Sequence, residues 1–143
     1  MSVRAILKVK GQRVVTVKSS DTARIAVAAM AKERIGAVVV TDDDRTVAGI
    51  LSERDIINAL NKHGERLLDM TVRELMTQSV TVAKIDMPIL QVLDVMTKGR
   101  FRHMPVIDDG QLSGLVSIGD AVKARLDILE SETTQLRDYI GGR

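Results

Sequence analysis

The stretch GILSERD, from Gly49 to Asp55, recurs later in the chain as GLVSIGD, from Gly114 to Asp120. In both copies a glycine is followed by two apolar residues, a serine, two variable residues and an aspartate. The second copy begins 65 residues after the first. A serine and an aspartate that recur at the same spacing after an apolar run indicate a duplicated structural unit.

Further matches follow the same order along the chain. Thr16-Val17 matches Thr81-Val82 at the shift of 65 residues, and VRAIL at 3–7 is similar to VRELM at 72–76. Between Thr16-Val17 and GILSERD, Met30 matches Met96 and Asp42 matches Asp108 at a shift of 66 residues, which indicates a one-residue insertion that is later undone. The duplication therefore predicts two repeats, at 3–68 and 72–130, followed by a helical tail at 131–143.

Each repeat predicts the same order of elements: strand, helix, strand, strand, helix. Short β-branched runs predict the first strands, and apolar residues at i, i+3, i+4 and i+7 predict the helices that follow them. An acidic turn between two apolar runs predicts a hairpin, after which the serine opens a final helix. The predicted elements are, in the first repeat, 14–17, 22–34, 37–42, 47–52 and 53–64, and in the second, 79–82, 87–99, 104–108, 112–117 and 118–129. One such unit cannot cover both faces of its sheet, so the two repeats are expected to pack together in an α+β fold.

The tail continues a helical pattern. Leu129, Leu136 and Ile140 keep helical spacing, and Thr133 interrupts the apolar series. Because the polar face carries charges of both signs, the pattern favours a packing or dimer helix over a membrane-surface helix.

Composition excludes several classes of function. The 143 residues include no cysteine, which excludes disulfides, thiolate zinc sites and cysteine nucleophiles. Two histidines leave too few imidazoles for a metal site, so no metal is expected. The net charge of +2 is spread over mixed signs, and one Tyr, one Phe and no Trp argue against nucleic-acid binding. Apolar runs too short to span a membrane, and an N-terminus unlike a signal peptide, predict a cytoplasmic protein.

Catalytic motifs are also missing from the sequence. It contains no G-x-G-x-x-G, no G-K-[ST] loop, no histidine–carboxylate metal spacing and no G-x-S-x-G elbow. We therefore expect that the protein is not an enzyme.

The repeated Ser-x-x-Asp has two interpretations. As a helix cap, the serine and the aspartate satisfy free N–H groups at the helix start, which is typically worth about 1 kcal/mol. As a ligand site, the helix N-terminus and the serine hydroxyl attract phosphate, while the carboxylate accepts both hydroxyls of a ribose. Both roles can coexist, because a hydroxyl has more than one bonding site. The cap alone does not explain the glycine that precedes each serine.

Two strand–helix–strand–strand–helix units that each close with G-h-h-S-x-x-D, together with RHMPVID at 102–108, resemble tandem CBS (cystathionine β-synthase) domains. The resemblance covers the chain from about Val3 to Leu129. It implies a pseudo-twofold pair of repeats, a Bateman module, whose clefts bind AMP, ADP, ATP, NAD(H) or S-adenosylmethionine. The segments SERD and RHMPV are similar to the subgroup that binds AMP or NAD(H), which implies a regulatory, energy-sensing role in signal transduction.

The resemblance also implies roles for individual residues. The aspartates would hold ribose hydroxyls, the serines would face phosphate, and backbone on the first two strands of each repeat would flank adenine. The implied ribose and phosphate residues are Asp55, Asp120, Ser52 and Ser117. The implied adenine residues are Thr16, Val17, Ala37, Val38, Thr81, Val82, Met104 and Pro105.

The two copies differ in their positive charges. Arg100, Arg102 and His103 stand in the second repeat, where the first repeat has Arg34, Gly36 and Ala37. Arg54 precedes Asp55, whereas Gly119 precedes Asp120. Taken as phosphate ligands, the three cationic residues predict that the second-repeat cleft, with Asp120, is the stronger site. Their alternative interpretation is solvated strand-edge charge and a half-buried histidine.

Two functions remain open at this point. The first is a non-catalytic sensor of adenine nucleotides that acts on an effector protein. The second is an oligomerisation or protein-interaction module with vestigial clefts, against which the paired serines and aspartates argue. In either case, apolar helix faces that include Ile56, Ile57 and Leu60 predict a homodimer formed through the helices of the repeats.

Overall fold

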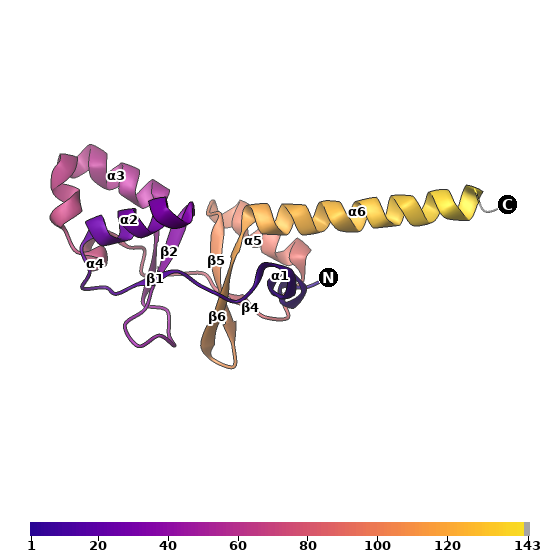
Figure 1. Cartoon of the computed structure of the whole chain (residues 1–143), viewed down its shortest axis with the longest axis horizontal. Helices are drawn as coiled ribbons and strands as arrows, with labels where there is room; N and C mark the ends of the chain where they lie inside the picture. The colour runs from indigo at the N-terminus through magenta and orange to yellow at the C-terminus, as the bar shows by residue number, and fades with distance from the viewer. Residues whose placement is uncertain (142–143) are drawn as a thin grey trace.

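The computed structural model describes residues 1–141 and contains two three-stranded sheets, one for each repeat (Figure 1). In each sheet the first strand is parallel to the second, and the second is antiparallel to the third. The first sheet consists of β1 (Thr16–Val17), β2 (Ala37–Val40) and β3 (Gly49–Ser52), and the second of β4 (Ala83–Lys84), β5 (His103–Asp108) and β6 (Gln111–Ser117). The predicted α+β fold is confirmed.

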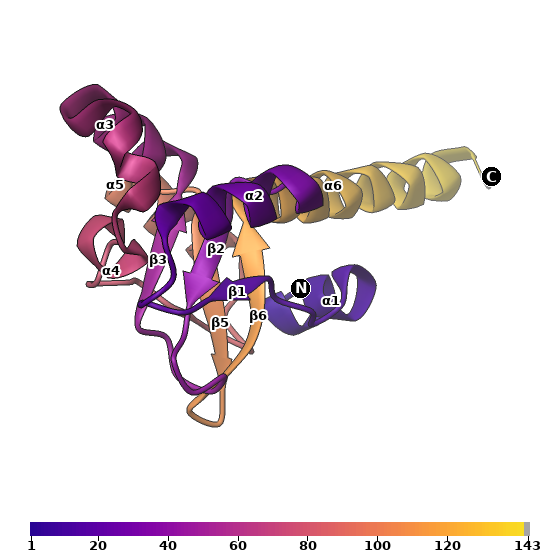
Figure 2. The ribbon, with the colours of Figure 1, turned by 60° about the vertical axis from the view of Figure 1, so that its left-hand side comes forward.

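Two helices follow the strands of each repeat. Their bounds are α2 (Ala23–Glu33) and α3 (Glu53–His63) in the first repeat, and α5 (Ile89–Gly99) and α6 (Ile118–Gly141) in the second. In two views, α2 and α6 lie along the same side of the sheets (Figures 1 and 2). A 3-10 segment, η1 (Gly64–Asp69), links α3 to the second repeat. The separate tail predicted from residue 131 is the continuation of α6, and residues 142 and 143 lie outside the described part of the chain.

Each repeat begins with a short helix that packs against the other repeat. Val3 and Leu7 of α1 (Val3–Lys10) are buried in the core of the second repeat. Val72 of α4 (Val72–Leu75) is buried in the core of the first. The backbone of Thr77, just after α4, exchanges two hydrogen bonds with Ile50 of β3, of 2.9 and 3.0 Å. The similar segments at 3–7 and 72–76 are therefore exchanged between the repeats.

The exchange explains the glycine that precedes each serine. A Cβ atom on Gly114 would lie 2.8 Å from two methyl carbons of Leu7 in α1. A Cβ atom on Gly49 would lie 2.6 Å from the sulfur of Met76 and 2.8 Å from the carbonyl oxygen of Thr77. Each glycine thus leaves the space in which the exchanged segment crosses the third strand.

The hairpins are confirmed, but one predicted strand is displaced. β2 pairs with β3, and β5 pairs with β6, in antiparallel ladders joined by acidic turns. The strand predicted at 79–82 is instead β4, at Ala83–Lys84. Ala83 and Ile85 are buried, whereas Val82 is 38% exposed, so the alternation that buries Ala83 and Ile85 sets the register.

Residues 1–141 contain no helix with the length and apolar composition that crossing a bilayer requires, although α6 has 24 residues.

The exchanged packing can be tested with two matched glycine substitutions. We expect Gly49→Ala to lower the free energy of unfolding by about 1–3 kcal/mol, because its Cβ would meet the backbone oxygen of Thr77. Gly114→Ala should lower the free energy of unfolding by less, since the end of the Leu7 side chain can move. Urea unfolding measures both, and an equal or reversed order would contradict the packing described for Thr77.

Candidate functional site

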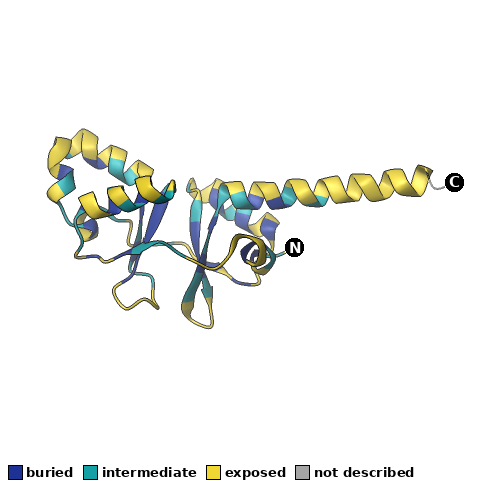
Figure 3. Cartoon of the chain, viewed as in Figure 1, coloured by how far each residue is buried: buried dark blue, intermediate teal, exposed yellow. Residues whose placement is uncertain are grey.

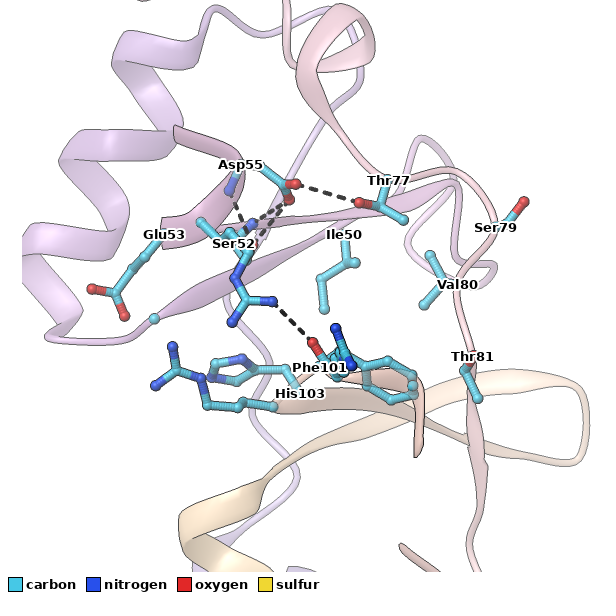
Figure 4. A pocket seen from close by; sticks show the side chains of 15 residues that line it. Ile50, Ser52, Glu53, Asp55, Thr77, Ser79, Val80, Thr81, Phe101 and His103 are labelled. Atoms are coloured by element: carbon cyan, nitrogen blue, oxygen red, sulfur yellow. Dashed lines mark hydrogen bonds between the residues drawn. The ribbon is translucent and has the colours of Figure 1, made fainter. Parts of the chain in front are cut away.

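A cleft of about 530 Å³ lies between the two repeats. The first repeat contributes the end of β3 and the first turn of α3, and the second contributes the segment from α5 to β5 (Figure 4). The loop between α4 and β4 forms a further wall with Thr77, Ser79, Val80 and Thr81. Residues from both repeats therefore face one volume of the size that small ligands occupy.

Asp55 lies in this cleft and also caps α3. Its Oδ2 accepts hydrogen bonds from the backbone N–H of Ser52 at 2.9 Å and from the Ser52 hydroxyl at 3.0 Å. The backbone N–H of Asp55 donates in return to Ser52 Oγ at 3.3 Å, which completes a capping box. Its second oxygen, Oδ1, has only a long contact of 3.5 Å with Thr77 Oγ1 among the described residues. The cap interpretation is confirmed, and it leaves one carboxylate oxygen for a ligand.

Positive charges from the second repeat line the same cleft. Arg100, Arg102 and His103 line the cleft from the segment that joins α5 to β5, and His103 lies across the cleft from Asp55 (Figure 4). Arg54 Nη1 donates to the backbone oxygen of Arg100 at 3.0 Å and so ties the two sides of the cleft together. The cleft is therefore lined by two carboxylates, those of Asp55 and Glu53, and by the cationic or titratable groups of Arg54, Arg100, Arg102 and His103.

The sequence groups these cations with Asp120, and His103 does lie near Asp120, whose charge acts on its imidazole. His103 is the ladder partner of Ser117, the serine of the second motif, so its backbone is close to Asp120. Its side chain, however, lines the cleft that contains Asp55. The motif of the first repeat thus faces a turn of the second repeat, which the spacing of residues along one repeat does not reveal.

Asp120 has a different partner. It forms the same reciprocal cap, with the backbone N–H of Ser117 at 2.9 Å from Oδ2 and its own N–H at 3.1 Å from Ser117 Oγ. Lys10, at the end of the exchanged helix α1, donates from Nζ to Asp120 Oδ2 at 2.7 Å and to the Leu115 carbonyl at 2.8 Å. A lysine of the chain itself therefore neutralises the second aspartate.

The pKa of Asp120 reflects this arrangement. Partial burial opposes ionisation of the carboxyl group, but the hydrogen bond from Lys10, the N–H of Ser117 and the charge of Lys10 outweigh it. Together they hold the pKa of Asp120 below its ordinary value. The carboxylate is thus ionised and paired before any ligand arrives.

His103 is held in its neutral form. Burial lowers its pKa below the ordinary value of 6.5, and the positive charges of Lys10 and Arg102 lower it further. Glu53 and Asp120 act in the opposite direction with smaller effect. A negatively charged phosphate beside this imidazole would favour its protonation.

Some of the other predicted site residues line the cleft, and the rest lie elsewhere in the two repeats. Thr81 lines the cleft, together with Ser52, Arg54, Asp55, Arg100, Arg102 and His103. The side chains of five predicted adenine residues are buried in the two cores: Val17, Ala37, Val38, Met104 and Pro105. Thr16 and Val82 lie on or beside the first strands, and Ser117 lies with Asp120. No cluster of potential metal ligands occurs among residues 1–141.

Sequence reasoning missed part of the cleft wall. Thr77 and Ser79 line the cleft directly after α4. The sequence contains a signal for both residues, because they follow the repeated segment 72–76. Phe101, the one phenylalanine of the chain, also lines the cleft and was not singled out.

A family model of the CBS domain matches residues 6–62 and 72–127. The chain belongs to the CBS domain family. Both matched segments contain one G-h-h-S-x-x-D motif, and their number agrees with the two repeats of the fold.

Solved structures of CBS proteins have the same architecture. The protein ATU1752 from Agrobacterium tumefaciens is 42% identical, with a TM-score of 0.84 over 87% of this chain and 99% of that one. The protein PAE2072 from Pyrobaculum aerophilum, solved with AMP, is 26% identical, with a TM-score of 0.78 over 93% of this chain and 99% of that one. The CBS domain pair of MJ0100, solved with 5'-methylthioadenosine and S-adenosyl-L-methionine, is 26% identical, with a TM-score of 0.77 over 87% of this chain and 94% of that one. The chain spans 70% of the length of one curated relative, 62% of the length of a second and 25% of the length of a third.

The buried neutral imidazole predicts a pH dependence of stability. Because the pKa of His103 is lower in the folded state, the unfolded chain binds a proton first as pH falls below about 6.5. The free energy of unfolding should therefore decrease as the pH is lowered from 7.5 to 5.5, by at most about 1.4 kcal/mol per pH unit. His103→Gln should reduce this fall in urea unfolding, whereas His63→Gln, which removes the other imidazole, should retain it. A wild-type pH profile in His103→Gln would exclude the histidine as its source.

Proposed function

We propose that the cleft between the repeats binds an adenine nucleotide, and that the protein is a non-catalytic regulatory module of the Bateman type. One observation carries the proposal: a carboxylate with a free oxygen and a group of cations lie on opposite sides of one cleft. A nucleotide has the complementary pattern, with ribose hydroxyls that donate and a phosphate that carries negative charge.

The cleft residues suggest how each part of the nucleotide is held. Asp55 accepts hydrogen bonds from the ribose hydroxyls through Oδ1. Arg100 and Arg102 bind the phosphate group, and His103 joins them when it is protonated. The side chains of Ile50 and Val80 supply apolar contact for the base.

The positive charges favour a ligand with phosphate. The two related complexes contain AMP in one protein and methylthioadenosine with S-adenosylmethionine in the other, so an adenosine group is common to them. Methylthioadenosine and S-adenosylmethionine carry no phosphate with which two arginines could pair. We therefore propose AMP or NAD(H) as the ligand.

Binding between two repeats also suggests how the ligand acts. A nucleotide that contacts Asp55 in one repeat and Arg102 in the other stabilises one relative placement of the repeats. An effector protein that recognises this placement would read the nucleotide level, which gives an energy-sensing role. Such an effector and a cytoplasmic location remain predictions.

The surroundings of Asp120 favour the vestigial alternative for the second motif. Lys10 is bound to Oδ2 of Asp120, and the first repeat has Gly36 and Ala37 where the second has Arg102 and His103. We propose that one nucleotide binds per chain, at Asp55.

The two aspartates provide matched variants. Asp55→Asn keeps the shape of the side chain but removes a charged acceptor, and should weaken AMP binding by roughly 1.5–3 kcal/mol, on the order of ten- to a hundredfold. Asp120→Asn should leave AMP affinity within about twofold, since its carboxylate is paired with Lys10. Titration calorimetry measures both affinities and the stoichiometry. Unchanged affinity in Asp55→Asn would reduce the motif to a helix cap.

The phosphate contact has its own test. Arg102→Ala should weaken AMP binding by roughly 1.5–3 kcal/mol and leave the weaker affinity for adenosine almost unchanged, because its partner is the phosphate. Arg34→Ala, in the corresponding turn of the first repeat, is the control and should not alter AMP binding. Equal losses for AMP and adenosine in Arg102→Ala would indicate that the arginine shapes the cleft and does not contact phosphate.

A further inference from the structure

Within residues 1–141, no other element packs against the distal half of α6. Near its start, Ala121 and Ala124 are buried against the second repeat. From Leu129 to Gly141 every residue is exposed, and the helix extends beyond the rest of the molecule (Figure 3). An isolated helix of this length is marginal in water, so it requires a partner to be stable.

The exposed helix presents a regular apolar seam. Its members are spaced alternately four and three residues apart, which is the heptad pattern of a coiled coil. They are Val122, Leu126, Leu129, Thr133, Leu136 and Ile140. The five apolar side chains are 41–63% exposed. In the heptad, Leu126, Thr133 and Ile140 occupy position a, and the other three occupy position d. Thr133 is the one polar member.

We propose that this seam is an interface on which α6 of a second copy of the chain packs in parallel. The argument rests on the charged residues that flank the seam. In a parallel pair, position g of one helix faces position e of the next heptad of the other. Arg125 would then face the partner's Glu130, and Glu132 would face the partner's Arg137. Opposite charges meet on both sides of the coil.

The antiparallel arrangement places like charges together. With the seams aligned in opposite directions, Glu130 would face the partner's Glu130, and Glu132 the partner's Glu132. Lys123 would face the partner's Arg137. Each of these contacts is repulsive, so the sequence of α6 selects the parallel pair.

The flanking side chains are available for these contacts. Within residues 1–141, none of the four that form the parallel pairs takes part in an intramolecular salt bridge: Arg125, Glu130, Glu132 and Arg137. The inference does not depend on the proposed nucleotide site.

A parallel coil also determines how the two copies lie. Its twofold axis runs along the helices, and α6 follows the long axis of the molecule (Figure 1). The copies therefore lie side by side, with like repeats together. Ile57 and Leu60 of α3, which are 64% and 52% exposed, remain candidates for further contact in this dimer, as the sequence predicts.

Light scattering and sedimentation of the full chain test the interface. The wild-type protein should be a dimer at micromolar concentration. Leu129→Glu with Leu136→Glu places charges in the seam and should weaken dimerisation by at least about a hundredfold. The control is Ser131→Glu with Gln135→Glu, which adds the same charge on the outward face of α6 and should remain dimeric. A monomeric wild-type chain, or a seam variant that still forms the wild-type dimer, would overturn the proposal.

Two further variants test the orientation. Since the chain has no cysteine, Ile140→Cys introduces a single thiol at the end of the seam. Parallel helices bring the two thiols together, and mild oxidation should give a cross-linked dimer, whereas antiparallel helices keep them apart. Glu132→Arg should weaken the dimer, and Glu132→Arg with Arg137→Glu should restore it. Absence of the cross-link or of the restoration would overturn the parallel arrangement.

Nucleotide titrations keep the two proposals separate. Leu129→Glu with Leu136→Glu leaves the cleft residues unchanged, so it should retain AMP affinity within about threefold while it dissociates the dimer. A variant that remains folded and binds AMP as a monomer would support both proposals. Loss of AMP binding in Asp55→Asn with an intact dimer would show that the interface stands without the ligand.

Discussion

Val3 and Val72 are both fully buried, and each lies in the core of the repeat to which it does not belong in sequence. This exchange of the two leading segments is the constraint on which the rest of the structure depends. It requires a glycine where each segment crosses a third strand, and it holds the two sheets side by side. It also brings Thr77 to Asp55 and Lys10 to Asp120, and these contacts make the two aspartates unequal.

The start of a helix performs two tasks in this protein. Each aspartate uses one oxygen to satisfy the backbone N–H of its serine, so the carboxylate is fixed in place without a ligand. At Asp55 the remaining oxygen faces a cleft with cations beyond it. At Asp120 the ammonium group of Lys10 is bound to the same oxygen as the cap. The same Ser-x-x-Asp motif therefore leads to different chemistry, because the contacts from distant segments differ.

Much of the fold could be predicted from the sequence. The repeat, the hairpins and the helix starts depend on short-range patterns, such as the serine and aspartate of GILSERD and the β-branched run in AVVV. The displaced strand β4 shows the limit, since burial of Ala83 and Ile85 overrides the β-branched run before them.

The site was harder to predict than the fold. The sequence identifies Asp55, Arg102 and His103 as candidates, but their grouping depends on how the two repeats face one another. That arrangement follows from tertiary packing, which no motif encodes. Similarly, nothing in the local pattern of α1 predicts that Lys10 reaches Asp120, 110 residues away.

The exchanged helix α1 also affects how the protein is made. During synthesis α1 emerges from the ribosome well before β6, because Leu115, to which Lys10 is hydrogen-bonded, follows 105 residues later. At a synthesis rate of about 5–20 residues per second, the apolar side chains of α1 remain uncovered for several seconds before β6, against which they pack, has been made. Contacts over such long sequence separations also slow folding. The apolar face of α1 therefore stays uncovered until the second repeat has been made, whereas the core of the first repeat needs only α4, which follows it directly.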